Sequence, residues 1–441
     1  MKLNLAKLNH VLIPTTKAER DRFRRGPLGR IVRPLGAFYA TLTEEGRILF
    51  TLSFLVGGFG VDVSATVVHL LWAALVALVL GSLVVHRAYR IDPFRIEVAA
   101  ARRITVGEEM TFTVLLHNDG DRDRHAVRVL GPFLPWDGRW VGEVPRVARV
   151  PAGSSVRAEV RARFVERGEH HLDAFHAAAL VPMGLALGPG VASAGVRFLV
   201  VPRIASVVRL ALPLGRRHQP GGVALASKTG ESMDLLGVRP YRPGDPVRHL
   251  HARSWARVGA PVVREYQEEY FSRVGVLVET AGADADTAEA ILSLAAGVVA
   301  HLSRGEALID LLVVGGEVHD LTLGRNLGFL DQALDLLACV QVGAKAPADV
   351  RGRRRREKPA PEAPLPDALL GRLAPHLGRL SCMVVVTARW DEGALAERIR
   401  GAGVGCRTLL VQGGGRLEGA PGPEVVVVDA AAIARGEALS L

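Results

Sequence analysis

Apolar residues are concentrated first in two runs near the N-terminus. Residues 66–85 contain no Asp, Glu, Lys or Arg. A helix of this length rises about 30 Å, which is the thickness of the hydrocarbon core of a membrane. The preceding run, residues 48–61, is also apolar, but it is shorter and contains Gly57, Gly58 and Gly60. Residues 66–85 are therefore predicted to span a membrane, whereas residues 48–61 considered alone could form a re-entrant segment.

Basic residues flank this pair of apolar runs on both sides. The flanking arginines are Arg25, Arg30, Arg33 and Arg47 before the pair, and Arg87 and Arg90 after it. The connecting VDVS carries no basic residue. Because positively charged flanks stay in the cytoplasm, both flanks are expected on that side, which requires two spans. The sequence thus predicts a two-helix transmembrane hairpin at residues 47–86, preceded by a basic cytoplasmic arm at residues 1–46.

A strict alternation of apolar and polar residues follows in residues 92–203. It is clearest in residues 111–116 and 156–164, and polar turn clusters separate such runs. Short alternating strands joined by turns favour an antiparallel β-sandwich with one packed and one wet face. His170 and His171 lie in one of these strands. Because neighbouring strand residues point to opposite faces, the pair is not expected to bind one metal ion, and we interpret both as surface histidines.

In residues 273–441 the pattern changes to continuous apolar strands alternating with amphipathic helices. The expected strands are residues 274–278, 308–314, 382–386, 407–411 and 424–428, and the expected helices are residues 287–302, 327–337, 367–374 and 393–399. Asp367 is the expected N-cap of its helix, and Pro375 is expected near its end. This pattern predicts an α/β domain with a mostly parallel sheet covered on both faces.

The formal net charge of +10 is unevenly distributed. One basic concentration lies in the N-terminal arm, where an anionic lipid surface is the simplest partner. The other, Arg351 to Arg356, lies in a Pro/Ala-rich insertion at residues 344–366 that is predicted to be a disordered, solvated loop. Contact of this insertion with anionic lipid or with a partner remains open. Neither concentration has the interleaved aromatic residues of a nucleic-acid platform, so no specific nucleic-acid partner is expected.

Cys339, Cys382 and Cys406 are odd in number and lack metal-ligand spacing. They lie in or beside apolar runs, which favours buried thiols in a reducing compartment.

The stretch from Gly230 to Tyr270 reads GESMDLLGVRPYRPGDPVRHLHARSWARVGAPVVREYQEEY. In it, Arg239 and Tyr241 are expected on one face of a short strand. Pro243 and Gly244 favour a tight turn, and Asp245 follows close to Arg242 and Arg248. Further charges are contributed by Arg257, Arg264 and Glu265. Such a network could brace the neighbouring sheet domain or form a polar docking surface, and the two roles are compatible.

The pattern G-E…G-V-R-x-Y-x-P-G-D-x-V-R…A-R…V-R-E resembles the signature of the bacterial family called "domain of unknown function 58". Members combine a membrane hairpin, a β-rich region, this signature (here residues 204–272) and a domain similar to von Willebrand factor A. The resemblance covers the chain from about residue 40 onward. One departure is Leu250-His251-Ala252, where the family usually has Trp; here Trp255 follows three positions later.

The resemblance implies a multi-pass protein of the bacterial inner membrane whose soluble domains lie in the cytoplasm. It also implies an accessory role beside a MoxR-like AAA+ ATPase in assembly or maintenance of envelope complexes, with other membrane proteins as further partners. The signature residues implied to bind a partner or to stabilise the segment are Arg239, Tyr241, Gly244, Asp245, Arg248, Arg257, Arg264 and Glu265.

Domains similar to von Willebrand factor A often bind Mg²⁺ through Asp-x-Ser-x-Ser after the first strand. The corresponding residues here are Glu279, Ala281 and Ala283. Because Mg²⁺ prefers a compact octahedral set of hard oxygen ligands, the loss of both hydroxyls predicts a degenerate site without metal. No cofactor is expected.

The sequence contains no G-x-S-x-G, no H-E-x-x-H and no P-loop motif. We therefore expect a non-catalytic, membrane-anchored interaction protein. One alternative is a hydrolase that uses His249 or His251 with Glu265 or Asp245, with Ser232 or Ser254 nearby. A second alternative is binding of anionic lipid or nucleic acid through residues 351–356.

Overall fold

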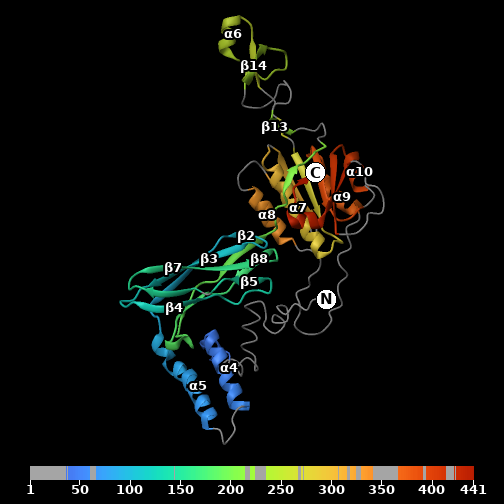
Figure 1. Ribbon diagram of the computed structural model, residues 1–441. Coiled ribbons are helices and arrows are strands. Elements are labelled where there is room, and N and C mark those ends of the chain that lie inside the picture. The colour runs from blue at the N-terminus through green and yellow to red at the C-terminus, as the bar shows by residue number, and fades with distance from the viewer. Residues whose placement is uncertain are drawn as a thin grey trace. The chain divides into compact units, whose positions relative to one another are not determined.

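Figure 1 shows the computed structural model of the chain. The described residues are 36, 38–59, 66–143, 145–213, 219–223, 235–266, 270–271, 273–305, 307–314, 318–323, 329–340, 366–390, 394–413, 422 and 424–441. They fall into two compact units, Met1–Val200 and Val201–Leu441, which are described separately. Residues 1–35, residues 60–65 and the predicted insertion before Pro366 lie outside the described residues.

Two helices follow the N-terminal arm, α4 (Glu44–Phe59) and α5 (Thr66–Val85). Among the described residues, two helical stretches are long and apolar enough to cross a membrane, Val67–Tyr89 and Ala285–Leu302. The first contains most of α5 and exposes most of its side chains, whereas the second is mostly buried in its own domain. The chain therefore has one exposed candidate membrane helix near its N-terminus, and α4 is shorter.

Gly57 of α4 lies against the indole ring of Trp72 in α5. A Cβ atom added at Gly57 would lie 2.3 Å from the indole nitrogen of Trp72. The absence of a side chain at this position therefore allows the ring to pack directly on the α4 backbone.

Three antiparallel sheets follow α5. The first has the order β1 (Phe94–Ala99), β3 (Glu109–Asn118), β7 (Ser155–Phe164), β5 (Gly138–Val141). The second has the order β10 (Val191–Ala192), β9 (His176–Ala179), β4 (Arg124–Leu130), β6 (Arg146–Val150). The third has the order β2 (Arg103–Thr105), β11 (Val196–Val201), β8 (Gly168–Leu172). The predicted β-rich domain is thus confirmed.

The core of this β domain is built from the inward side chains of the alternating strands. In β3 every second residue from Met110 to Asn118 is buried. The sequence pattern predicts this for a strand with one face packed on the core and the other facing solvent. Phe112 is fully buried, and its ring centroid lies 5.3 Å from that of Phe175 and 5.9 Å from that of Phe198. The alternation therefore arises because one face of each strand packs around this aromatic cluster.

The second unit contains a six-stranded sheet in the order β19-β18-β17-β20-β21-β22. Its strands are β17 (Arg273–Glu279), β18 (Leu308–Val314), β19 (Val318–Leu323), β20 (Cys382–Thr387), β21 (Gly405–Gln412) and β22 (Val425–Asp429). Five strands are parallel, and β19 pairs antiparallel with β18. The parallel sheet is confirmed, and each predicted strand lies within two residues of an observed one. The antiparallel edge strand β19 was not predicted.

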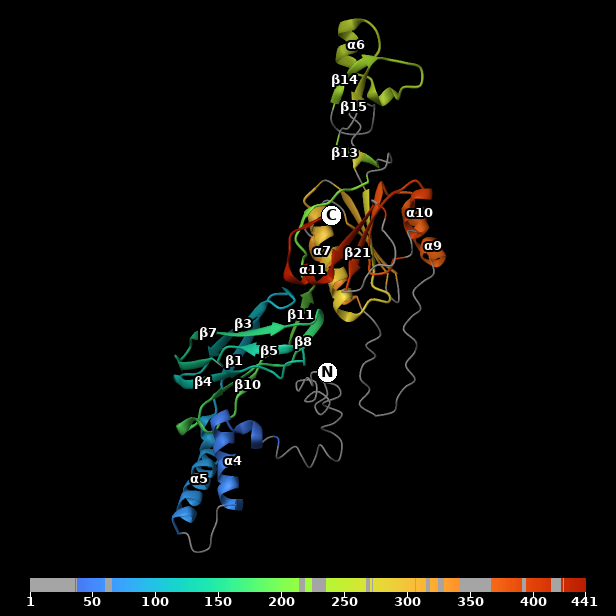
Figure 2. The ribbon, with the colours of Figure 1, turned by 45° about the vertical axis from the view of Figure 1, so that its right-hand side comes forward.

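Helices cover both faces of this sheet (Figure 2). One side carries α7 (Ala285–Leu302), α8 (Phe329–Cys339) and α11 (Ala430–Arg435), and the other carries α9 (Pro366–Leu377) and α10 (Ala394–Gly401). Asp284 caps α7 by accepting a hydrogen bond from the Thr287 amide at 2.9 Å. Two short strands, β12 (Val207–Arg209) and β23 (Leu439–Ser440), pair in parallel beside this layer.

Two local predictions in this unit were wrong, the N-cap of α9 and the burial of Cys339. Helix α9 begins with Pro366, so Asp367 lies inside its first turn instead of capping it, whereas Pro375 lies near the end of the helix as expected. Proline is accepted at a first helical position because its missing N–H has no partner there. Cys382 and Cys406 are buried as predicted, whereas Cys339 is exposed at the end of α8.

In sequence, the elements of the signature lie between β12 and β17. Strands β14 (Leu235–Pro240) and β15 (Val262–Tyr266) pair antiparallel, and η3 (Val247–His249) and α6 (Ala252–Val258) lie between them in sequence. A second small pair joins β13 (Gln219–Val223) to β16 (Tyr270–Phe271).

Candidate functional site

The β14–β15 pair provides the frame of the signature segment. Arg239 lies opposite Val263, and Gly237 lies opposite Glu265. The amide of Tyr241 donates to the carbonyl oxygen of Pro261 at 2.9 Å, which extends the pairing beyond Pro240. This register places Arg239 and Glu265 close together, although 26 residues separate them in sequence.

A tight turn follows β14, as the sequence predicts. The amide of Asp245 donates to the carbonyl oxygen of Arg242 at 3.0 Å, and a carboxylate oxygen of Asp245 accepts from the Arg242 amide at 2.8 Å. Gly244 has a φ of 104°, a conformation that only glycine adopts without strain. Gly244 therefore permits the turn, and Asp245 closes it by bonding to its backbone.

Arg239 connects this turn to β15, and we call the contacts of Arg239 with Asp245 and Glu265 the clamp. Its two terminal nitrogens donate to the two carboxylate oxygens of Asp245, both at 2.7 Å, and its Nε donates to Glu265 at 3.2 Å. The hydrogen bonds from Arg239, followed by the one from the Arg242 amide, lower the pKa of Asp245 to about 2. Arg242 and Arg248 were the cations predicted beside Asp245. The charge of Arg242 does contribute to this lowered pKa, but the paired hydrogen bonds come from Arg239, which was not predicted as the partner.

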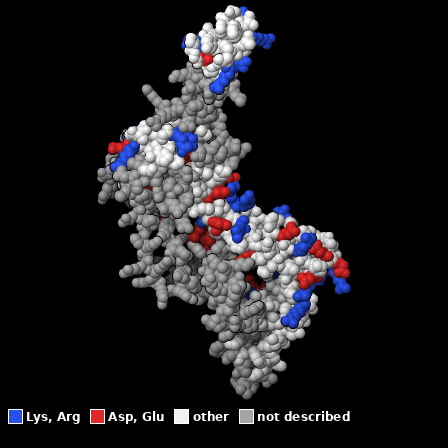
Figure 3. Space-filling model, turned by 180° about the vertical axis from the view of Figure 1, so that it is seen from behind, with Lys and Arg blue, Asp and Glu red and all other residues white. Residues whose placement is uncertain are grey.

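The other cations of the segment lie on its surface. The exposed arginines are Arg242, Arg248, Arg253, Arg257 and Arg264. The exposed large apolar side chains are Val238, Tyr241, Val247, Trp255 and Val258. We call these ten residues the signature surface. Figure 3 shows basic side chains prominent on this segment, which is the part labelled α6 and β14 in Figure 1.

The predicted site residues therefore divide into two groups. Arg239, Gly244, Asp245 and Glu265 belong to the clamp and its turn, whereas Tyr241, Arg248, Arg257 and Arg264 belong to the signature surface. The apolar members Val247 and Val258 were not among the predicted site residues. Val247 lies in η3 and Val258 in α6, each close in sequence to arginines. Apolar residues placed among arginines in this way are a signal that could have identified them.

Two of the alternative catalytic residues, His251 and Ser254, are in contact. Nδ1 of His251 lies 2.7 Å from the hydroxyl oxygen of Ser254, one helical turn further along the chain. No ion pair joins His251 to a carboxylate in the part of the chain that the structure describes, and Ser232 lies outside it. In a nucleophile–base pair of a hydrolase, a third group orients the base.

Glu279 ends β17 at the position where a von Willebrand-like domain would bind Mg²⁺. Its side chain is buried, accepts a hydrogen bond from the Thr387 hydroxyl at 3.0 Å, and lies 3.6 Å from a guanidinium nitrogen of Arg389. Ala281 and Ala283 offer no side-chain oxygen. Among the described residues, no three His, Cys, Asp or Glu side chains lie close enough to hold a metal. The residues therefore do not fit Mg²⁺, because a cationic side chain already neutralises the one carboxylate.

Comparisons with known proteins add little to this geometry. No family model matches the chain, and no curated protein matches its sequence. The native alpha-2-macroglobulin of Escherichia coli, from domain MG7 to the C-terminus, is 15% identical over 31% of this chain and 20% of that one, with a TM-score of 0.22. The SrpA adhesin of Streptococcus sanguinis is 14% identical over 31% of this chain and 85% of that one, with a TM-score of 0.18. The chain spans a fifth or less of the two macroglobulin structures. At these TM-scores the similarities support no inference about fold or function.

Proposed function

We propose that this protein is a membrane-anchored, non-catalytic interaction protein that binds its partner through the signature surface. The observation that carries the proposal is how few residues of the signature segment are buried. Among residues 237–265, all of them described, only Val262 and Val263 are buried. A two-stranded hairpin with so small a core is marginal in water. A surface that combines arginines with Trp255 and Tyr241 has the composition of a protein interface.

The anchor in this proposal is a hairpin of α4 and α5 in a bacterial inner membrane. The length and exposed apolar surface of α5, the contact of Gly57 with Trp72 and the arginines on both flanks support it. The soluble domains would then lie in the cytoplasm. A thiol reagent that cannot cross the membrane should label a cysteine placed at Ser64 in intact cells, but not one placed at Arg139. Labelling at Arg139 would contradict this topology.

The proposed partner is a MoxR-like AAA+ ATPase, and the protein would assist it in assembly or maintenance of envelope complexes. The resemblance of the signature to "domain of unknown function 58" supports this choice, as does the resemblance of the sheet domain to von Willebrand factor A. The excess of arginines on the signature surface favours a partner with an acidic face, because complementary charges steer association and suppress wrong partners.

The test is capture of the ATPase by full-length protein in mild detergent. We expect Trp255→Ala and Arg257→Glu each to abolish capture, because both side chains are exposed on the signature surface. Arg139→Glu is the matched control, since Arg139 is an exposed arginine of the β domain. Capture that survives both signature changes would overturn the docking role.

The clamp provides a second control within the same segment. Arg239→Lys loses the paired hydrogen bonds to Asp245 while it keeps the charge. If the clamp only braces the segment, this variant should lower the stability of the β14–β15 pair. Arg257→Glu should leave the stability of that pair unchanged. A loss of capture in Arg257→Glu without loss of stability would therefore separate docking from bracing.

A further inference from the structure

The residues that lead into α4 are bonded to one loop of the β domain. The amide of Thr43 donates to the carbonyl oxygen of Leu185 at 3.0 Å, and the Thr43 hydroxyl donates to that of Gly184 at 2.6 Å. The amide of Leu187 donates to the carbonyl oxygen of Thr41 at 2.8 Å. These bonds form a short antiparallel pairing immediately before the first turn of α4. We call residues 181–188 the hairpin-contacting loop.

The residues that follow α5 meet the same loop. A Cβ atom on Gly188 would lie 2.2 Å from the carbonyl oxygen of Tyr89, so only glycine allows this approach. The Arg124 guanidinium, at the start of β4, donates to the carbonyl oxygens of Arg90 at 3.3 Å and Asp92 at 2.7 Å. The hairpin-contacting loop and this end of the β domain are therefore fixed beside both the entry to α4 and the exit from α5.

The tip of this loop exposes an apolar side chain. Met183 has a φ of 69°, and its side chain is 73% exposed, the highest exposure of any large apolar residue in the β domain as described. Pro182 precedes it and is also exposed. Because the apolar spans start and end beside this loop, its tip lies at the depth of the lipid head groups if the spans cross a membrane. Apolar side chains at that depth are stabilised by the boundary between head groups and acyl chains.

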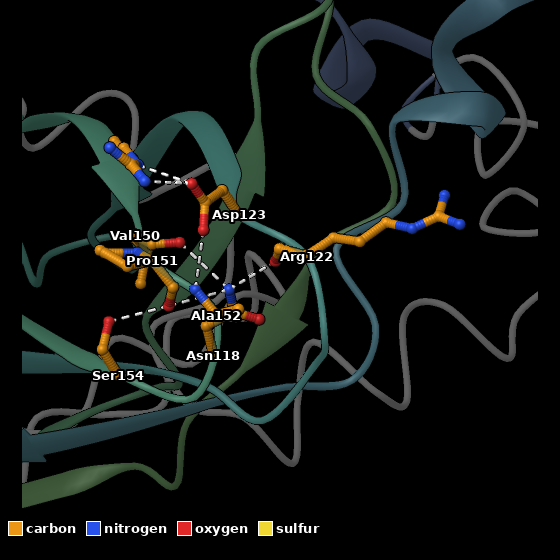
Figure 4. A network of polar contacts seen from close by, with 8 residues as sticks. Asn118, Arg122, Asp123, Val150, Pro151, Ala152 and Ser154 are labelled. Carbon is orange, nitrogen blue, oxygen red and sulfur yellow. Dashed lines mark hydrogen bonds and ion pairs between the residues drawn. The ribbon is translucent and has the colours of Figure 1, made fainter.

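Exposed arginines occur at the same end of the β domain. Arg87 lies in the turn η1 (His86–Tyr89) that follows α5. Arg122 lies in the turn between β3 and β4, where the side-chain amide of Asn118 donates to its carbonyl oxygen at 2.8 Å. Figure 4 shows the Arg122 side chain extending away from the network around Asn118 and Asp123. Its guanidinium has no carboxylate partner among the described residues, in contrast to that of Arg149, which pairs with Asp123.

We infer that this end of the β domain binds the surface of an anionic phospholipid bilayer. Met183 inserts at the boundary of head groups and acyl chains, and Arg87 and Arg122 contact lipid phosphates. The inference rests on the membrane anchor proposed above, but it is independent of the partner and of the signature surface. Its consequence is that the β domain is held against the membrane and does not swing freely on the hairpin.

The test uses a fluorescent label on single cysteines in the full-length protein, reconstituted in nanodiscs of phosphatidylcholine and phosphatidylglycerol. Cys339 is exposed and is first replaced by Ser. Cys382 and Cys406 are buried, and burial followed by the charge of Cys406 raises the pKa of Cys382 to about 12, so neither competes for the label. The labelled variants are Met183→Cys, Val165→Cys and Leu78→Cys. Val165 is 55% exposed and follows β7 at the end opposite Ser155, and Leu78 lies within α5.

We expect nitroxide-bearing lipids to quench the labels at positions 183 and 78, and aqueous iodide to quench the label at position 165. Iodide quenching at position 183 with lipid quenching at position 78 would overturn the inference and leave the anchor intact. Protection of position 183 from both quenchers would also overturn it, because another protein surface would then cover the loop. Failure of lipid quenching at position 78 would overturn the anchor and the inference together.

The role of charge is tested in the same system. Arg122→Glu should weaken lipid quenching at position 183 by about twofold or more in phosphatidylglycerol-containing discs, since arginine at a membrane surface is attracted to anionic lipid. Arg139→Glu, an exposed arginine change in β5, is the control that should leave the quenching unchanged. Equal lipid quenching at position 183 in Arg122→Glu and Arg139→Glu would exclude contact between Arg122 and lipid phosphates.

Discussion

The guanidinium of Arg239 binds both carboxylate oxygens of Asp245 at 2.7 Å, across the turn that ends β14. This contact is bidentate, and the planar guanidinium matches the spacing of the two oxygens. Asp245 bonds at the same time to the Arg242 amide at 2.8 Å. One carboxylate therefore connects the strand, the turn and, through Arg239, the partner strand β15.

The first prediction concerns this clamp. Asp245→Asn should speed hydrogen exchange of the Tyr241 amide several-fold, because it removes the charge that holds Arg239 and the turn. Arg242→Ala is the matched control, since Arg242 donates its hydrogen bond to Asp245 through the backbone amide, which alanine keeps. Exchange measured by NMR or mass spectrometry on the full-length protein decides the matter. Unchanged exchange in Asp245→Asn would contradict a structural role for the clamp.

The same carboxylate predicts an acid transition. Because the pKa of Asp245 is lowered to about 2 by Arg239 and the Arg242 amide, its stabilising contribution is present above the unfolded value of about 3.9. It is lost as the pH falls from there toward 2. The protection factor of the Tyr241 amide should fall across this window in the wild type, whereas in Asp245→Asn it should be lower and should not change across the window.

The second prediction concerns a buried histidine of the β domain. Nε2 of His170 lies 2.8 Å from a carboxylate oxygen of Asp137, and Nδ1 lies 3.0 Å from the carbonyl oxygen of Gly168. Both partners are acceptors, so both ring nitrogens donate and the ring is an imidazolium. Burial lowers the pKa of His170, but the hydrogen bond and charge of Asp137, with the Gly168 carbonyl, raise it above its usual value overall.

The sign of the pH dependence follows from this raised pKa. The stabilisation is fully present below the unfolded pKa of about 6.5, and it is lost as the pH rises through the higher folded value. His170→Gln should remove this dependence and cost about 1.5–3 kcal/mol at pH 6, the contribution of a hydrogen bond to a charged group. His171→Gln is the control, because His171 is exposed on the opposite face of β8. Urea unfolding at pH 6 and pH 8.5 measures both, and an equal pH dependence in wild type and His170→Gln would refute the assignment.

His170 also shows where sequence reasoning reaches its limit. The alternation of β8 correctly separates His170 from His171 onto two faces, but it does not say which face is packed. We interpreted both as surface residues, and this was wrong for His170, which is buried. The counterion that makes its burial tolerable, Asp137, is 33 residues away in sequence. Polar partners of this kind are set by the fold and carry no local signal.

The strands of the parallel sheet were predicted more accurately. Fully buried strands have no polar face, and both β17 and β20 are buried at every residue. Strand β19 was not predicted, because its sequence, VHDLTL, mixes charged with apolar residues, as the sequence of an edge strand does. The clamp partner of Asp245 was assigned by proximity in sequence, whereas the hairpin turn brings Arg239 to it. Patterns of burial were therefore predictable, and specific polar pairs were not.

The third prediction concerns the ion pair of β17 and β18. Nε of Arg273 donates to Asp310 at 2.7 Å and a terminal nitrogen donates at 2.9 Å, and the Asp310 side chain is almost fully buried. Asp310→Ala should destabilise the sheet domain by about 3–5 kcal/mol, because it leaves a buried guanidinium without its counterion. The double change Arg273→Met with Asp310→Leu should recover much of that loss, since no uncompensated charge remains. Thermal unfolding of the three full-length proteins measures this, and a double variant no more stable than Asp310→Ala would contradict the explanation.

The last prediction concerns the carboxylate at the end of β17. Glu279 is buried, bonded to the Thr387 hydroxyl and 3.6 Å from Arg389, and the two positions that would supply hydroxyl ligands are Ala281 and Ala283. Millimolar Mg²⁺ should therefore not shift the melting temperature of the wild type, because a bound ion would have to displace a cationic side chain and would gain few oxygen ligands. Arg389→Ala should lower stability, since it removes the cation beside a buried carboxylate. The decisive comparison is the melting temperature of wild type, Arg389→Ala and the double change Arg389→Ala with Glu279→Gln, each with and without Mg²⁺. Partial recovery in the double change would attribute the loss to the unpaired Glu279 charge. A Mg²⁺-dependent rise in the wild type that disappears in Glu279→Gln would instead establish a metal site.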